Sequence, residues 1–211
     1  MKGADTVAQV NRFRESRYLV IDNLLSGEDF HAAGLEFDCV DLRPGLSDIE
    51  PIYDGMSYRG KSSTIDCADR MTSPLKLAIR DQLVASFGAD EACPNNEIRF
   101  SVNSWGYPSG SRLSWHNDGG TGRLGAFVFF VHEKWSAGWG GELAVLDIEA
   151  RSPGTADPFS AATTGLSPVM LWPRPNRLVL LKSYTPHSIL RVDTTAGDRL
   201  RKTFSGFVSN E

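Results

Sequence analysis

Cysteine is scarce in this sequence. The 211 residues contain three cysteines, Cys39, Cys67 and Cys93, which are widely spaced and form no Cys-x-x-Cys pair. An odd number of separated cysteines argues against a disulfide framework and against a zinc knuckle. We therefore expect the chain to belong to a reducing compartment, the cytoplasm.

Basic tracts and long apolar runs are also missing. The chain has 22 Lys and Arg against 26 Asp and Glu, a formal net charge of -4, with no extended Lys/Arg run. Proteins that bind nucleic acid carry a basic footprint, so we expect no nucleic-acid partner. No stretch is as long and apolar as a membrane helix, and residues 1–16 lack the apolar segment of a signal peptide. We expect no membrane partner either, and the oligomeric state stays open.

The size and the composition of the chain are those of one globular domain. Hydrophobic residues make up 41% and charged residues 23% of the 211 residues. Both fractions are ordinary for a soluble protein, and a chain of this length can bury a sizeable core. We therefore predict a single domain over residues 1–211.

The local pattern changes near residue 96. Before it, one helix is predicted over 27–36, where Ser26 can cap the first turn, and another over 74–84, where apolar residues recur at helical spacing. After it come short β-favouring segments separated by Gly, Pro, Asn and Asp. These segments are 98–104, 124–132, 142–147, 177–182, 188–192 and 202–208.

Helices first and strands afterwards predict an α+β protein. Helical support and loops over 1–95 would buttress a sandwich or barrel over 96–211. The polar segment 149–167 has no period, and we predict a lid there or at Asp54-Gly55, because loops over a rigid scaffold carry specificity.

Three residues have the composition of a metal site: His116, Asp118 and His187. In a strand, residues i and i+2 project from the same face, so His-x-Asp would present an imidazole beside a carboxylate. His187 could come from a neighbouring strand. Two imidazoles and one carboxylate leave an open face on iron in non-haem Fe(II) oxygenases, and similar sets bind zinc in hydrolases. The three residues alone leave open both metals and a purely structural role.

The residues around this motif resemble the double-stranded β-helix (jelly-roll) fold of Fe(II)- and 2-oxoglutarate-dependent oxygenases, and more narrowly the prolyl-hydroxylase-like branch. The resemblance is ordered along residues 100–208. Its parts are a Tyr-x-x-Gly lead-in at 107–110, His-x-Asp at 116–118, a hydrophobic strand at 126–131, Gly-Gly-Glu-Leu at 140–143, Pro-x-x-x-Arg-Leu-Val-Leu at 173–180 and the distal histidine at 187.

The resemblance implies a role for each matching residue. His116, Asp118 and His187 resemble the catalytic iron ligands, and Arg201 with Thr203 resembles the pair that binds the far carboxylate of 2-oxoglutarate. The planar fork of arginine suits a carboxylate. Arg199 is the alternative to Arg201 for this role. Tyr107 occupies a position at which members of the family often have an aromatic hydroxyl that hydrogen-bonds the co-substrate.

The resemblance further implies a dioxygenase that uses Fe(II), 2-oxoglutarate and O2. It would hydroxylate a C–H bond of a small amino-acid-like metabolite or a peptidyl residue and release succinate and CO2. Related halogenases carry a small residue in place of the carboxylate, so Asp118 favours hydroxylation. Two alternatives stay open: a zinc-dependent hydrolase with the same triad, and a non-catalytic β-sandwich binding protein.

Four further residues are candidates for substrate contacts. Arg112 precedes the first metal motif and Arg191 follows the second, so either could anchor a carboxylate or phosphate, as could Arg59. Trp115 could stack on a substrate, although aromatic residues in strands usually belong to the core.

Overall fold

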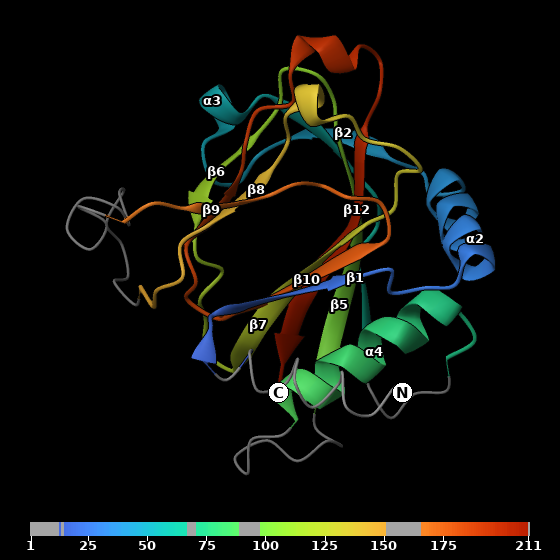
Figure 1. The fold of residues 1–211 in the computed structure, drawn as a ribbon, viewed down its shortest axis with the longest axis vertical. Coiled ribbons are helices and arrows are strands. Elements are labelled where there is room, and N and C mark those ends of the chain that lie inside the picture. Colours follow the sequence, from blue (N-terminus) through green and yellow to red (C-terminus); the bar gives the residue numbers. More distant parts are fainter. Residues whose placement is uncertain (1–12, 14, 67–70, 89–97, 151–165, 211) are drawn as a thin grey trace.

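Two antiparallel β-sheets and two longer helices make up the fold in the computed structural model (Figure 1). The structure describes residues 13, 15–66, 71–88, 98–150 and 166–210. The helices cover one face of the larger sheet, and the smaller sheet lies against its other face. This arrangement confirms the predicted α+β class and the jelly-roll core.

The larger sheet has the strand order β1-β10-β7-β12-β5-β3-β2, and β4 also pairs with β5. Its strands, all in antiparallel pairs, are β1 (Tyr18–Asp22), β2 (Arg43–Leu46), β3 (Met56–Arg59), β4 (Ser63–Asp66), β5 (Arg99–Tyr107), β7 (Arg123–Phe130), β10 (Arg177–Lys182) and β12 (Arg201–Ser209). The region before residue 96 therefore supplies strands to this sheet as well as helices.

The smaller sheet has the order β6-β11-β8-β9. Its strands are β6 (Leu113–His116), β8 (Leu143–Val145), β9 (Val169–Leu171) and β11 (His187–Ile189), and they too pair antiparallel. The short helical turns are α3 (Pro51–Asp54), η1 (Ala137–Trp139) and η2 (Thr194–Ala196).

The two predicted helices are confirmed, and each begins at a capping serine. The Ser26 hydroxyl accepts a hydrogen bond from the Asp29 N–H at the start of α2 (Gly27–Asp38). Ser73 does the same for Lys76 in α4 (Pro74–Phe87). Side-chain acceptors of this kind satisfy N–H groups that a first helical turn leaves without a partner.

The larger sheet separates two hydrophobic cores. In β10, Leu178 and Leu180 pack with the helices, whereas Val179 and Leu181 pack with the smaller sheet. Successive side chains of a strand point to opposite faces, so a strand covered on both sides is apolar at every position. The helix-side core therefore covers one face of the larger sheet, and the site lies on the side of the smaller sheet.

The part of the chain that the structure describes bears on several other expectations. It holds no helix long and apolar enough to span a membrane. Cys39 is a free, exposed thiol. Cys67, Cys93 and most of the segment 149–167 lie outside the described residues. The cytoplasmic location and the lid at 149–167 therefore stay predictions.

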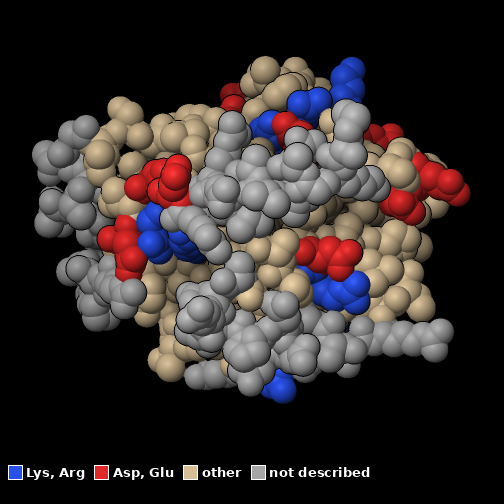
Figure 2. Space-filling model, turned by 60° about the horizontal axis from the view of Figure 1, so that its bottom comes forward, with Lys and Arg blue, Asp and Glu red and all other residues tan. Residues whose placement is uncertain are grey.

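Charged side chains are mixed on the face of the molecule that Figure 2 shows. There, Lys and Arg side chains lie beside Asp and Glu side chains and do not gather into a patch of one sign. The expected absence of a nucleic-acid partner stays a prediction.

We expect His132 to make the protein sensitive to acid. This residue is 5% exposed, its Nε2–H donates to the Pro173 carbonyl at 2.7 Å, and burial lowers its pKa to about 4. An unfolded chain protonates histidine near pH 6.5, so stability is complete above that pH and falls toward pH 4, by up to about 3 kcal/mol.

The variant His132→Gln keeps an N–H donor and cannot be protonated. Its free energy of unfolding, measured with urea between pH 7 and pH 4.5, should therefore decline less than that of the wild type. Equal declines in the two proteins would contradict the assignment.

Candidate metal centre and its pocket

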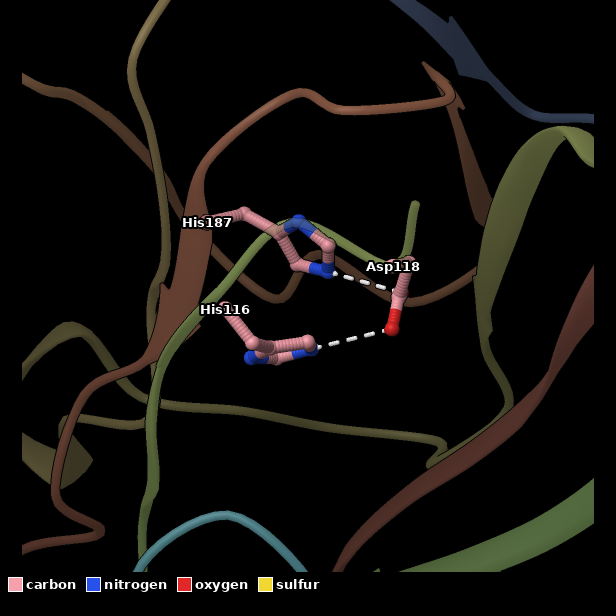
Figure 3. Close-up of side chains that lie close together, drawn as sticks. All are labelled: His116, Asp118 and His187. Carbon is pink, nitrogen blue, oxygen red and sulfur yellow. Dashed lines mark ion pairs between the residues drawn. The ribbon is translucent and has the colours of Figure 1, made fainter. Parts of the chain in front are cut away.

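Two neighbouring strands of the smaller sheet bring the two candidate histidines together. In the antiparallel pairing of β6 with β11, His187 lies directly opposite His116, and their ring centroids are 4.2 Å apart. Both rings point toward Asp118 (Figure 3). His116 Nε2 is 3.6 Å from Asp118 Oδ1, and His187 Nε2 is 3.2 Å from Asp118 Oδ2. One ligand atom from each residue lies within 4.8 Å of the others, so the set could hold a metal ion.

Asp118 reaches this position through a turn, which corrects the strand geometry expected for His-x-Asp. Strand β6 ends at His116, and Asp118 has a left-handed backbone with φ 52°. Aspartate is among the residues that tolerate this region. The Asn117 side chain accepts from the Gly119 N–H at 3.1 Å and donates to the Ala150 carbonyl at 2.8 Å. Arg123 donates to the Asp118 carbonyl at 3.0 Å. Hydrogen bonds therefore hold the turn on both sides of Asp118.

The histidine rings are oriented by main-chain carbonyl groups. His116 Nδ1 lies 2.8 Å from the Ser114 carbonyl, and His187 Nδ1 lies 2.8 Å from the Thr185 carbonyl. A carbonyl only accepts hydrogen bonds, so each Nδ1 carries a proton when the ring is neutral and each Nε2 keeps a lone pair. Without a metal, His187 Nε2 lies within hydrogen-bond distance of Asp118 Oδ2, whereas the neutral His116 presents its Nε2 lone pair to the same carboxylate. Acceptors facing acceptors repel one another, and a cation between them removes the repulsion, so this donor set fits a metal ion.

The charge states of His116 and Asp118 suit metal binding, and His187 would release its Nε2 proton when a metal binds. Burial, and then His187, lower the pKa of His116 to about 4. Burial alone would raise the pKa of Asp118, but its hydrogen bond and charge interaction with His187 bring that pKa down to about 2. Burial lowers the pKa of His187, and Asp118 raises it further than burial lowers it. At neutral pH His116 is therefore neutral and Asp118 is an anion.

A buried arginine faces the same pocket from the larger sheet. Arg201 is 0% exposed, and burial lowers its pKa to about 10. Its Nε donates to the Gly141 carbonyl at 2.6 Å, whereas Nη1 and Nη2 have no hydrogen-bond partner. Burying unpaired donors of a cation is costly, and two parallel N–H groups match a carboxylate. The orphaned fork therefore fits a carboxylate ligand. Arg199 is exposed and stacks on Trp139, so of the two arginines Arg201 is the one at the pocket.

Tyr107 and Thr203 stand next to Arg201. Tyr107 lies opposite Arg201 in the pairing of β5 with β12, and burial raises its pKa. Thr203 is two residues along β12 on the same face and is buried. The cavity, of about 270 Å3, is lined by all six predicted metal and co-substrate residues. They are His116, Asp118, His187, Arg201, Thr203 and Tyr107.

The four predicted substrate residues are not among the residues that line this cavity. Arg112 Nε is 3.5 Å from Asp54 Oδ1, Arg191 donates to the Gly110 and Tyr53 carbonyls, and Arg59 forms an exposed ion pair with Asp48 at 3.7 Å. Trp115 follows Ser114 and precedes His116 in β6, so its side chain points to the other face of the strand from His116. Proximity in sequence to the metal motifs therefore did not place these side chains in the pocket.

Other lining residues were missed. They include Asn103 of β5, Ser205 and Phe207 of β12, and Asp48 in the segment after β2. The three strand residues share a face with Tyr107 and Arg201, because every second residue of a strand points the same way. The alternation in the sequence could have found them, whereas Asp48 carries no such signal.

The comparisons with known proteins agree with this geometry. The sequence model of the 2OG-Fe(II) oxygenase superfamily matches residues 100–209. A comparison with curated proteins found no match.

Several solved structures share the fold. A prolyl-4-hydroxylase from Pseudomonas putida has 19% sequence identity over 98% of this chain and 99% of that chain, with a TM-score of 0.68. A prolyl hydroxylase from Trichoplax adhaerens, in complex with a hypoxia inducible factor peptide, has 15% identity over 98% and 90%, with a TM-score of 0.64. HygX from Streptomyces hygroscopicus, with nickel, 2-oxoglutarate and hygromycin B bound, has 15% identity over 96% and 86%, with a TM-score of 0.62.

The unpaired fork of Arg201 should lower the stability of the ligand-free protein. Arg201→Met removes a buried charge, and we expect the free energy of unfolding in urea to rise by about 1 kcal/mol, although the lost bond to Gly141 offsets part of the gain. Arg199→Met, at an exposed position, should change it by less than about 0.5 kcal/mol. A destabilised Arg201→Met protein would show that the fork is satisfied without a ligand.

Proposed function

Because this chain belongs to the 2OG-Fe(II) oxygenase superfamily, we propose that it hydroxylates a C–H bond with His116, Asp118 and His187 as its iron ligands. The enzyme is a dioxygenase that uses Fe(II), 2-oxoglutarate and O2. The bound metal and co-substrate supply the oxidising chemistry, with succinate and CO2 as co-products. The observation that carries the assignment of ligands is the convergence of His116, Asp118 and His187, whose ligand atoms lie within 4.8 Å of one another.

The protein's own share of the reaction is binding and orientation. The carbonyl groups of Ser114 and Thr185 hold the proton of each ring on Nδ1, so that Nε2 is free for the metal. The hydrogen bonds of Asn117 hold the turn that aims Asp118. A carboxylate at this position, rather than a small residue, supports hydroxylation over halogenation.

Arg201, with Thr203 and Tyr107 beside it, is proposed to bind the far carboxylate of 2-oxoglutarate. Its two orphaned Nη groups offer the parallel N–H donors that a carboxylate accepts. The rings of Phe130 and Tyr107 lie 4.8 Å and 5.7 Å from the guanidinium carbon, so the cation is held in place on its faces. A zinc hydrolase with the same triad would leave this buried fork unexplained.

We propose that the substrate group entering the pocket is neutral or cationic. Among the described residues that line the cavity, Arg201 is the only arginine or lysine, whereas Asp118 and Asp48 are acidic. The arginines expected to anchor an anion, Arg112, Arg191 and Arg59, bind other groups. The Trichoplax relative is in complex with a peptide and HygX with hygromycin B. Of the two substrate classes that the sequence suggested, a peptidyl residue fits this lining better than a free amino acid.

The function is tested by succinate release in the presence of Fe(II) and 2-oxoglutarate, with and without EDTA. His116→Ala should abolish release because a metal ligand is lost, and Arg201→Ala should raise the 2-oxoglutarate requirement about tenfold or more, as charged hydrogen bonds contribute roughly 1.5–3 kcal/mol. His31→Ala, in the exposed face of α2, is the matched control and should keep wild-type turnover. EDTA-resistant turnover, or full activity of His116→Ala, would rule out the proposed site.

The substrate class is tested with paired compounds: free amino acids, and the same residues acetylated and amidated at their ends. Mass spectrometry would detect the gain of one oxygen atom. The blocked forms should be oxidised with a kcat/KM at least about tenfold higher, since Arg201, the one Arg or Lys among the described lining residues, is taken by the co-substrate and leaves no cation for a free substrate carboxylate. Equal or faster oxidation of the free acids would contradict the proposal.

A further inference from the structure

A buried carboxylate lies behind the metal centre, outside the pocket. Asp54 ends α3, is 0% exposed, and is not among the residues that line the cavity. A buried charge is costly unless several hydrogen bonds satisfy it. Asp54 was expected on a lid, but its burial excludes a freely moving one, and its partners indicate a different role.

The partners of Asp54 lie on two different elements. Oδ1 accepts from the Ser114 hydroxyl at 2.6 Å and from the Ser114 N–H at 3.0 Å, both in β6. Oδ2 accepts from the Glu50 N–H at 3.4 Å, and Arg112 Nε is 3.5 Å from Oδ1. Burial would raise the pKa of Asp54, but hydrogen bonds from Ser114, Ser47 and the Glu50 N–H keep it below its usual range. The group is therefore an anion held by directed donors.

Ser114 connects this carboxylate to His116. Its N–H and hydroxyl donate to Asp54, and its carbonyl accepts from His116 Nδ1 at 2.8 Å. One residue thus links the anion to the ring. Fixing Ser114 fixes the carbonyl, and the carbonyl sets both the direction of the ring and the nitrogen that carries its proton.

Asp54 also holds one wall of the pocket, through both its main-chain carbonyl and its carboxylate. The Asp54 carbonyl accepts from the Arg112 N–H at 2.8 Å, which adds a main-chain bond between α3 and the segment that enters β6. Ser47 and Asp48, which line the cavity, lie just before the Glu50 N–H that Asp54 binds. The wall and the metal strand are therefore joined at one buried side chain.

We infer that Asp54 is a positioning residue for the metal centre, which holds Ser114 so that the Ser114 carbonyl orients His116 toward the metal. The inference rests on the proposed role of His116 as an iron ligand. Asp54 lines no part of the cavity, and it acts on His116 through Ser114. An aspartate that only anchored α3 would stabilise the fold without changing how the metal is bound.

Co(II) is a suitable probe, because its visible absorption reports both affinity and ligand geometry without turnover. With the full chain, Asp54→Ala should weaken Co(II) binding about tenfold or more and change the spectrum, as loss of a partner that orients a ligand typically does. Thermal unfolding of the metal-free proteins reports the effect on the fold separately.

Asp193→Ala is the control matched in bond type. Asp193 Oδ1 accepts from the Thr195 N–H at 2.8 Å and from the Thr195 hydroxyl at 2.7 Å, the same pair of donors, but in η2 and outside the pocket lining. Its loss should leave the Co(II) affinity and spectrum unchanged.

Asp54→Asn keeps the volume and tests the inference if Asp54→Ala does not fold. Its amide places an N–H against one of the donors that Asp54 accepts, so we expect a smaller loss of Co(II) affinity, about threefold. Wild-type affinity and spectrum in the folded Asp54 variants, with a lower unfolding temperature, would overturn the positioning role alone. A wild-type protein that binds no Co(II) would overturn the proposed metal site as well.

Discussion

The antiparallel pairing of β6 with β11 is the contact on which the rest of the site depends. It places His187 opposite His116, so that two residues from distant parts of the sequence present their Nε2 atoms to one carboxylate. Both strands are short, and β8 on the far side of β11 holds their register through the pairing of His187 with Val145. A slip of one residue would turn a histidine to the opposite face and remove it from the centre. The geometry of the metal site is therefore a property of the sheet.

Binding groups that the fold fixes in place before a ligand arrives lower the electrostatic stability of the ligand-free protein. The Nε2 lone pair of the neutral His116 faces the Asp118 carboxylate, and the fork of Arg201 is buried without hydrogen-bond partners. Each arrangement is costly in the absence of a cation or an anion. The cores on both faces of the larger sheet, with strands such as β10 buried on both sides, stabilise the fold against this cost. The same features that lower the stability select the ligands. A metal ion would remove the repulsion at Asp118, and a carboxylate would accept the unpaired N–H groups of Arg201.

Features with a local or periodic signal could be predicted from the sequence, and features set by long-range contacts could not. Ser26 marked the start of α2, and the ordered motifs placed His116, His187 and Arg201 in one fold. The turn at Asp118 was wrongly expected to be a strand, because φ 52° depends on hydrogen bonds from Asn117 and Arg123. Arg112 was expected at the substrate and instead lies against Asp54. That aspartate stood in a stretch without periodicity, and nothing near it in the sequence indicates that it binds Ser114.

The two sheets divide the work of the site between them. The smaller sheet carries the two histidines, and the inner face of the larger sheet carries Arg201 and its neighbours. Beyond Arg201 on that face, the ring of Phe207 lies 3.7 Å from the guanidinium carbon of Arg123, which holds the turn at Asp118. Asn103 and Ser205 also line the cavity, and none of the hydrogen bonds or ion pairs described above joins them to His116, Asp118 or His187. Substitutions at these positions can therefore change the shape of the pocket while the metal centre keeps its own supports, Ser114 and Asn117. A fold built in this way separates what must stay fixed for oxidation from what can vary with the substrate.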